Sequence, residues 1–194
     1  MRVGVLALQG DFALHVAALR RVGVEPVEVR KPGALDDTDG LILPGGESTT
    51  LLHLMDAWDF WPGIMAFHAS GRPLFGTCAG LIVLAREVEG PRQPSLGLID
   101  VTVERNSYGR QRESFEAEVP AALDGGGPLR MVFIRAPRIR RVGPGVAVLA
   151  RHAGDPVLAR QGSVLVATFH PELTDDLTVH RYFCRMAEAQ AATV

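Results

Sequence analysis

Short apolar runs alternate with helix-like patterns through the first half of the chain. Residues 2–8 are almost continuously apolar, as is typical of a strand buried on both faces of a parallel sheet. Residues 11–22 then repeat apolar side chains at helical spacing and stop at Gly23, with Asp11 as the expected N-cap. A strand buried on both faces needs helices to cover it, so this alternation predicts an α/β fold.

The rest of the chain extends this pattern and then changes it. Further strands are expected at residues 25–30, 40–43 and 73–77, and helices at 48–58, opened by the hydroxyls of Ser48, Thr49 and Thr50, and at 79–86. Later segments read as strands at 96–104, 114–119, 129–134, 146–151, 156–160 and 163–168, before an amphipathic helix at 175–189. We expect a three-layer, mostly parallel, doubly wound (flavodoxin-like) sheet with added antiparallel strands, in one domain of residues 1–194.

Composition argues against nucleic-acid binding, membrane insertion and secretion. The formal net charge of −2 gives no electrostatic reason to expect nucleic acid or an anionic membrane as a partner. No stretch approaches the roughly 20 apolar residues of a membrane span, and the N-terminal apolar run is too interrupted for a signal peptide. Cys78 and Cys184 are too few for a disulfide framework, so we expect a reducing, cytoplasmic location.

The strongest chemical signal is the sequence Gly76-Thr77-Cys78-Ala79-Gly80, between a buried strand and a helix. G-x-C-x-G in this setting has the form of a nucleophile elbow, where small neighbours allow the strained turn that exposes the nucleophile. The positive end of the following helix favours a thiolate, and the backbone N–H of Ala79 is a candidate oxyanion donor. The alternative is a buried structural cysteine. Cys184 lies among apolar residues of the last helix and is expected to pack.

Two further segments supply partners for a thiol nucleophile. His170-Pro171-Glu172 follows an apolar strand, and residues two apart in an extended segment point the same way, so Glu172 can orient His170 as the base. Alone, H-P-E is a weak signal that favours a surface histidine, and the elbow cysteine together with the strand-end position reverses that preference. The sequence Pro44-Gly45-Gly46-Glu47 follows another strand and lacks the phosphate-loop spacing. Its glycines make it an oxyanion-hole candidate, as well as a tight turn before a helix.

Six segments, in order and across nearly the whole chain, resemble one protein family. They are VGVLALQGD at 3–11, LILPGGESTT at 41–50, FGTCAGLI at 75–82, ERNSYGRQRESFE at 104–116, FIRAP at 133–137 and ATFHPELTDD at 167–176. Together they resemble the PdxT family, the glutaminase subunits of pyridoxal 5′-phosphate synthase, which are class I (triad) glutamine amidotransferases. Ser107 and Tyr108 depart mildly from the family pattern, where Ala and Phe are more usual.

The resemblance implies roles for individual residues. It makes Cys78 the nucleophile, His170 the general acid and base, and Glu172 its orienting partner. It implies an L-glutamine site and an oxyanion hole that includes Gly46. The residues it assigns to the L-glutamine site are Gly46, Glu47, Ser48, Arg105, Ile134 and Arg135. Gln9 falls at a family position linked to the junction with the synthase subunit. Arg105 and Arg135 have an alternative interpretation as solvated surface arginines.

The resemblance also implies a partner. Glutamine would be hydrolysed to glutamate and ammonia, and the ammonia passed to a (β/α)₈-barrel synthase of the PdxS type that makes pyridoxal 5′-phosphate. This chain itself would need no cofactor and no metal, since its histidines are scattered rather than at ligand spacing. Three alternatives stay open: another class I amidotransferase, a cysteine hydrolase or stress protein on a related fold, and a binding module that has lost catalysis.

Overall fold

The computed structural model describes residues 1–105, 114–123 and 127–192. Residues 106–113, the middle of the family segment at 104–116, lie outside these ranges. No helix among the described residues is both long and apolar enough to cross a membrane.

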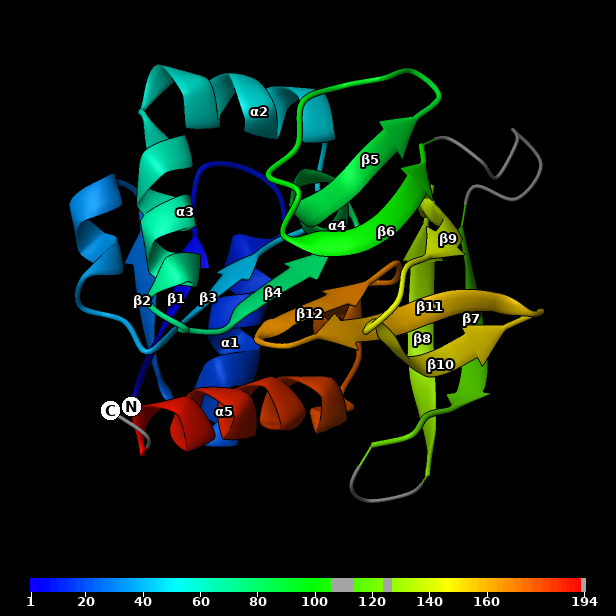
Figure 1. The fold of residues 1–194 in the computed structure, drawn as a ribbon. Helices are drawn as coiled ribbons and strands as arrows, with labels where there is room; N and C mark the ends of the chain where they lie inside the picture. The colour runs from blue at the N-terminus through cyan, green and yellow to red at the C-terminus, as the bar shows by residue number, and fades with distance from the viewer. Residues whose placement is uncertain (106–113, 124–126, 193–194) are drawn as a thin grey trace.

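A seven-stranded sheet forms the centre of the molecule, with strand order β10-β11-β12-β4-β3-β1-β2 (Figure 1). The last five strands in that order are parallel, and β11 runs antiparallel to both β10 and β12. The strands are β1 (Arg2–Leu6), β2 (Glu25–Val29), β3 (Gly40–Leu43), β4 (Leu74–Thr77), β10 (Ala147–His152), β11 (Asp155–Gln161) and β12 (Val164–Ala167). The expected parallel sheet with antiparallel strands at one side is confirmed.

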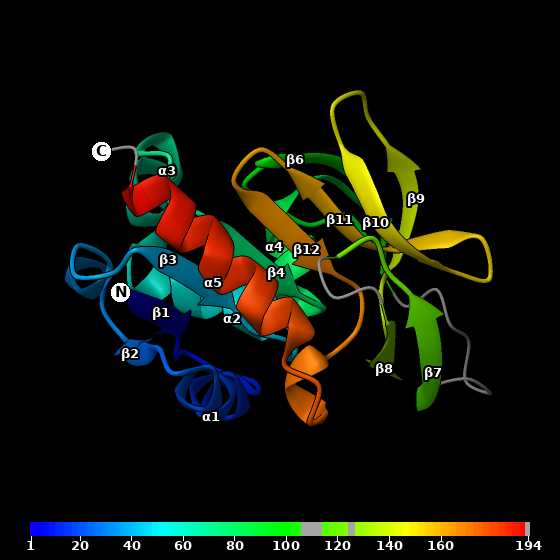
Figure 2. The ribbon, with the colours of Figure 1, turned by 90° about the horizontal axis from the view of Figure 1, so that it is seen from below.

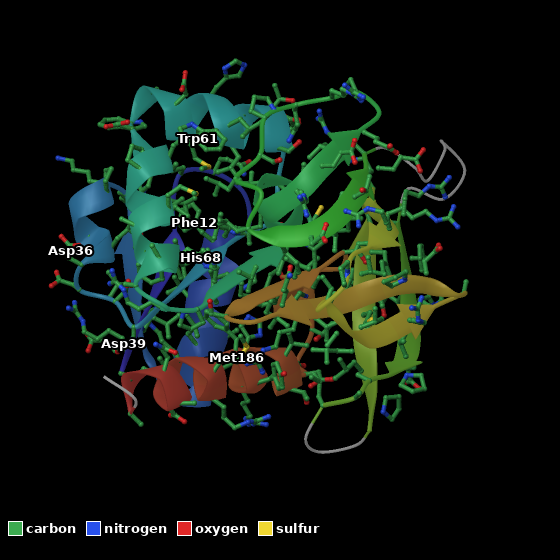
Figure 3. The ribbon with its side chains drawn as sticks, in the orientation of Figure 1. Phe12, Asp36, Asp39, Trp61, His68 and Met186 are labelled. Atoms are coloured by element: carbon green, nitrogen blue, oxygen red, sulfur yellow. The ribbon has the colours of Figure 1, made fainter. Side chains whose placement is uncertain are left out.

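Helices cover both faces of this sheet, which explains why its strands are apolar on both sides. One face carries α2 (Ser48–Ala57), α3 (Phe60–Ala69) and α4 (Ala79–Leu84), and the other carries α1 (Phe12–Val22) and α5 (Thr178–Ala191) (Figures 1 and 2). Trp61 of α3 and Met186 of α5 lie on opposite sides of the sheet (Figure 3). Each face has its own apolar cluster, so the fold is a three-layer α/β arrangement.

Two smaller sheets extend these layers. A three-stranded sheet of order β5-β6-β9 packs with the α2 face, and the antiparallel pair β7-β8 packs with the α1 face. Their strands are β5 (Ala85–Glu89), β6 (Ile99–Glu104), β7 (Ser114–Pro120), β8 (Pro128–Ile134) and β9 (Arg138–Val142). The two remaining elements are short 3₁₀ helices, η1 (Pro32–Leu35) and η2 (Pro171–Leu173).

The structure corrects several local expectations. Helix α3 and strands β5 and β9 were not predicted, and the helix expected at 79–86 ends at Leu84, where β5 begins. Asp11 occupies the N-cap position of α1 but its side chain makes no capping hydrogen bond. Helix α2 is capped by the Glu47 carboxylate, which accepts from the backbone N–H groups of Thr49 and Thr50, and not by the predicted hydroxyls.

Candidate functional site

Cys78 lies at the turn between β4 and α4, in the strained conformation that the elbow sequence predicts. Its φ is 47° and its ψ is −100°, a left-handed conformation that non-glycine residues rarely adopt. The flanking glycines avoid steric clashes in this turn, because a Cβ on Gly76 would lie 2.6 Å from the backbone of Gly80. A Cβ on Gly80 would collide with the carbonyl of Leu43 in β3. The sequence of this turn therefore fixes where the sulfur is held.

His170 and Glu172 lie beside Cys78, after the end of β12. The Nδ1 atom of His170 is 2.8 Å from Oε1 of Glu172, and both side chains are buried. The backbone N–H of His170 donates to the carbonyl of Val132 in β8, which anchors the segment to the neighbouring strand pair. The imidazole also makes a hydrogen bond with the Cys78 side chain. His170 therefore contacts both of the other residues predicted for the triad.

The protonation of this group follows from its contacts. Burial alone would lower the pKa of His170, but the hydrogen bonds with Cys78 and Glu172 outweigh burial and raise that pKa to about 10. Burial likewise works against the ionised form of Glu172, yet the nearby His15 and His170 hold the pKa of this carboxyl below its ordinary value. Near neutral pH the pair is an imidazolium and a carboxylate, which is the setting that stabilises a cysteine thiolate.

A cavity of about 180 Å³ opens in front of the Cys78 sulfur. It brings together all the residues predicted for glutamine recognition with the predicted nucleophile and base. Its lining residues are Asp11, Gly46, Glu47, Ser48, Cys78, Ile82, Arg105, Ile134, Arg135, Pro137 and His170. Ala79, the other predicted oxyanion donor, is completely buried at the start of α4.

The glycine loop after β3 is held by Gln9. The amide oxygen of Gln9 accepts a hydrogen bond from the backbone N–H of Glu47 at 3.1 Å. Gly46 has a φ of 145°, and a Cβ at this position would collide with the Gln9 side chain. Gln9, predicted only as a junction residue, is therefore also a direct contact of the predicted oxyanion loop.

The predicted glutamine-binding side chains come from three separate segments. Arg105 follows β6, and its Nη2 lies 3.7 Å from the Glu47 carboxylate and 3.3 Å from the Thr49 hydroxyl. Ser48 donates from its hydroxyl to the side chain of Gln93 at 3.2 Å. Arg135 follows β8 with a φ of 41° and an exposed side chain, so it shares with Cys78 a strained backbone at the cavity.

Sequence reasoning missed some residues of the site. Asp11 lines the cavity, and its Oδ2 lies 3.7 Å from Nδ1 of His170. Its position two residues after Gln9 was the available signal, but it was interpreted only as a helix cap. Asp11, His170 and Glu172 bring potential metal-ligand atoms within 4.8 Å of one another. These atoms already form the hydrogen bond and the ion pair described above, so the group has an explanation without a metal.

The comparison with protein families agrees with this geometry. Residues 5–189 match the family described as the SNO glutamine amidotransferase family. The chain belongs to that family.

Curated relatives from the same family cover nearly the whole chain. One from Thermotoga neapolitana, named pyridoxal 5′-phosphate synthase subunit PdxT, is 50% identical over 188 residues, which are 97% of this chain and 100% of the relative. A relative of the same name from Pelotomaculum thermopropionicum is 54% identical over 183 residues, 94% of this chain and 93% of the relative.

Solved structures agree on the fold. A crystal structure of a glutamine amidotransferase superimposes with a TM-score of 0.90 at 52% identity, covering 96% of this chain and 98% of that chain. The structure of PurLQS from Thermotoga maritima matches with a TM-score of 0.69 at 19% identity, over 95% and 97% of the two chains. The second match is a likeness of fold alone.

Proposed function

We propose that this chain is a cytoplasmic, single-domain glutaminase that hydrolyses L-glutamine and passes the ammonia to a synthase subunit for pyridoxal 5′-phosphate biosynthesis. The observation that carries the proposal is the contact of Cys78, His170 and Glu172 at a cavity lined by arginine and backbone groups. L-Glutamine has a carboxylate for such arginines and a side-chain amide for the thiolate to attack. The names of the relatives supply the biosynthetic assignment.

The chemistry begins with attack on the amide. The Cys78 thiolate forms a bond to the amide carbon, and the negative charge moves to the amide oxygen. The His170 imidazolium gives its proton to the nitrogen as the C–N bond breaks, which releases ammonia and leaves a thioester. Water then attacks the thioester with His170 as base, and glutamate leaves as Cys78 is restored. Glu172 keeps the imidazole oriented through both steps.

The loop of Gly46 and Glu47 can switch the glutaminase between a less active and a more active conformation. An N–H that is bonded to Gln9 is not available to an oxyanion, so the loop in this conformation is an incomplete oxyanion hole. We propose that docking of a (β/α)₈-barrel synthase of the PdxS type rearranges the loop toward the substrate. Free ammonia would protonate and diffuse away, and activation by the partner prevents its waste.

The test is a glutaminase assay of the isolated chain and of its complex with the cognate synthase, at equal concentration and saturating glutamine. We expect weak glutamate release alone, strong release in the complex, and pyridoxal phosphate formation from glutamine. Glutamate release without any pyridoxal phosphate would indicate a different amidotransferase. No glutamate release in the complex would favour a binding module, and the absence of a trapped thioester would settle that outcome.

A further inference from the structure

Two buried histidines lie close to Glu172, and the chemistry above does not use them. His15 belongs to α1 and His180 to α5, and neither has any exposed surface. The Nδ1 atom of His15 lies 3.0 Å from the Nε2 atom of His180. Buried polar side chains are normally hydrogen-bonded, and these two histidines satisfy each other. The glutaminase chemistry does not account for their burial beside Glu172.

His15 also reaches the predicted triad. Its Nε2 atom lies 3.3 Å from Oε2 of Glu172 and 3.3 Å from the hydroxyl oxygen of Thr77, the residue before the nucleophile. The other carboxylate oxygen, Oε1, is bonded to His170. The Glu172 carboxylate therefore lies between two imidazoles, with one oxygen directed to each. Oε2 has no hydrogen-bond partner among the described residues, and the Nε2 atom of His15 is a polar group within 3.3 Å of it.

Both of these histidines are neutral near neutral pH. Burial lowers the pKa of His15, and it lowers the pKa of His180 to about 3, with His15 acting in the same direction. The Glu172 carboxylate opposes both shifts but does not overcome burial. The other charged groups that act here are His170 and Asp11 on His15, and Arg21 on His180. A neutral imidazole has one N–H donor and one bare nitrogen, so each ring must be one of two tautomers.

The contacts select between these tautomers. If His15 had its proton on Nδ1, the bare Nε2 would face the Glu172 carboxylate, and the lone pair and the negative charge would repel each other. His180 would then have its proton on Nδ1, which is buried and has no partner in the described part of the chain. The opposite arrangement avoids the repulsion and leaves a bare nitrogen, not an N–H donor, unpartnered at Nδ1 of His180 among the described residues. The Nε2–H of His180 donates to Nδ1 of His15, and the Nε2–H of His15 donates to the Thr77 hydroxyl oxygen, with Oε2 of Glu172 also 3.3 Å from this nitrogen.

We propose that His15 is a positioning residue, whose Nε2–H holds the second oxygen of Glu172, and that His180 fixes the tautomer that makes this contact. The proposal rests on the glutaminase function given above. Partners behind a catalytic or ligating group set its orientation and basicity, and their loss typically costs about 10–100-fold in metal sites, where this has been measured. With Glu172 held, the His170 ring is oriented toward Cys78 and its imidazolium is stabilised.

The test compares His15→Leu with His15→Gln in the complex with the cognate synthase. Leucine removes the donor, whereas the glutamine amide nitrogen reaches roughly the position of Nε2. We expect His15→Leu to lower kcat by about 10–100-fold with KM changed less than twofold. His15→Gln should recover most of that loss. Because Glu172 would stabilise the imidazolium less well in His15→Leu, the pKa of His170 should fall, and the alkaline limb of the kcat/KM profile, where the imidazolium loses its proton, should move to lower pH.

A purely structural role predicts a different result. If both variants lose activity equally and the pH profile stays in place, His15 only packs, and the proposal is overturned. Wild-type kinetics in His15→Leu would overturn it as well.

A measurement on the unmodified chain covers the case in which His15→Leu does not fold. Nitrogen-15 NMR of histidine-labelled protein at neutral pH should show His15 and His180 neutral, with protons on Nε2. A proton on Nδ1 of His15 would overturn the proposal. Failure of the proposed function looks different, since the wild-type complex would then release no glutamate while the NMR result still reported on the contact between His15 and Glu172.

Discussion

The side chain of Gln9 holds the backbone N–H of Glu47 at 3.1 Å, and so links the end of the first strand to the loop that faces Cys78. This one hydrogen bond joins a predicted partner-contact residue to a predicted oxyanion loop. A synthase subunit that displaced Gln9 on docking would therefore change the position of the loop beside Cys78.

Replacing Gln9 should loosen that loop. We expect Gln9→Ala to raise the glutamate release of the isolated chain about 2–10-fold, because a typical hydrogen bond contributes about 0.5–1.5 kcal/mol. Gln9→Glu keeps an acceptor for the Glu47 N–H and should stay at the low wild-type rate. The measurement is glutamate formation without the synthase. Equal rates in both variants and wild type would mean that this bond does not restrain the loop.

The two cysteines should differ sharply in reactivity. Cys78 borders the cavity beside an imidazolium, whereas burial raises the pKa of Cys184 to about 12. A glutamine-like electrophile followed by peptide mapping should label Cys78 alone in the folded chain. Cys78→Ser should lower kcat by at least about 10³-fold, since a serine is not activated by this pair. Cys184→Ser should keep glutaminase activity, and a label on Cys184 in the folded protein would contradict the assignment.

Packing at the elbow gives a stability prediction. Alanine is ordinarily favoured over glycine in a helix by up to about 1 kcal/mol. At Gly80, however, the added Cβ would collide with the Leu43 carbonyl, which cannot move without breaking the sheet. We expect Gly80→Ala to lower the free energy of unfolding by about 1–3 kcal/mol in urea titrations.

The matched control for Gly80 is Gly33, in η1. A Cβ at Gly33 would meet no atom within 4 Å. Gly33→Ala should therefore leave the stability unchanged or raise it by up to about 1 kcal/mol. An equally large loss in both variants would show that packing against Leu43 is not the cause.

The buried histidines predict acid sensitivity. The pKa of His180 is lowered by burial and by His15 and Arg21, with Glu172 acting in the opposite direction, and the result is about 3. The unfolded chain, with an ordinary histidine pKa, binds the proton first as pH falls. The stability that depends on neutral His180 should therefore be fully present above about pH 6.5. The free energy of unfolding should decline as pH falls from there toward 3.

The size of this effect can be measured by substitution. As pH falls from 7 to 5, one such histidine lowers the free energy of unfolding by about 2 kcal/mol. His180→Phe should remove about that much of the difference in unfolding free energy between the two pH values. His53→Gln, at an exposed position on α2, should leave the pH dependence as it is in the wild type. An unchanged slope in His180→Phe would contradict the prediction.

Most of the central sheet could be predicted because its signal is local. Runs such as residues 2–8 and 163–168 are apolar enough to identify a strand buried on both faces, and β1 and β12 lie there. Helix α3 was missed because its first turn contains Trp61-Pro62-Gly63, which looks like a break, although proline is tolerated in a first turn. Strand β9 was missed because it is rich in arginine.

The arginines of β9 are explained by their partners. Arg138, Arg140 and Arg141 make ion pairs with Asp155, Glu104 and Asp100, respectively. Such pairing is between strands far apart in the sequence, so no local pattern reveals it.

The site residues could be predicted from the sequence because each lies in a short motif whose residue types and spacing suit one kind of chemistry. Cys78, His170 and Glu172 carry signals that can be interpreted residue by residue. His15 does not, because a lone histidine on an apolar helix face looks like any core residue. Its relation to Glu172 exists only once α1 and η2 are folded together. The roles of these residues, and the division of the chain into one domain, stay predictions that the experiments above address.

Both ends of the polypeptide contribute to one small site: Gln9 and Asp11 from the first strand and turn, and His170, Glu172 and His180 from the last segments. During translation, the first group leaves the ribosome long before the second is synthesised. A nascent chain can therefore contain the cysteine elbow before His170 and Glu172 have been synthesised. We therefore expect a chain that ends before residue 172 to lack glutaminase activity even where the elbow itself has been synthesised.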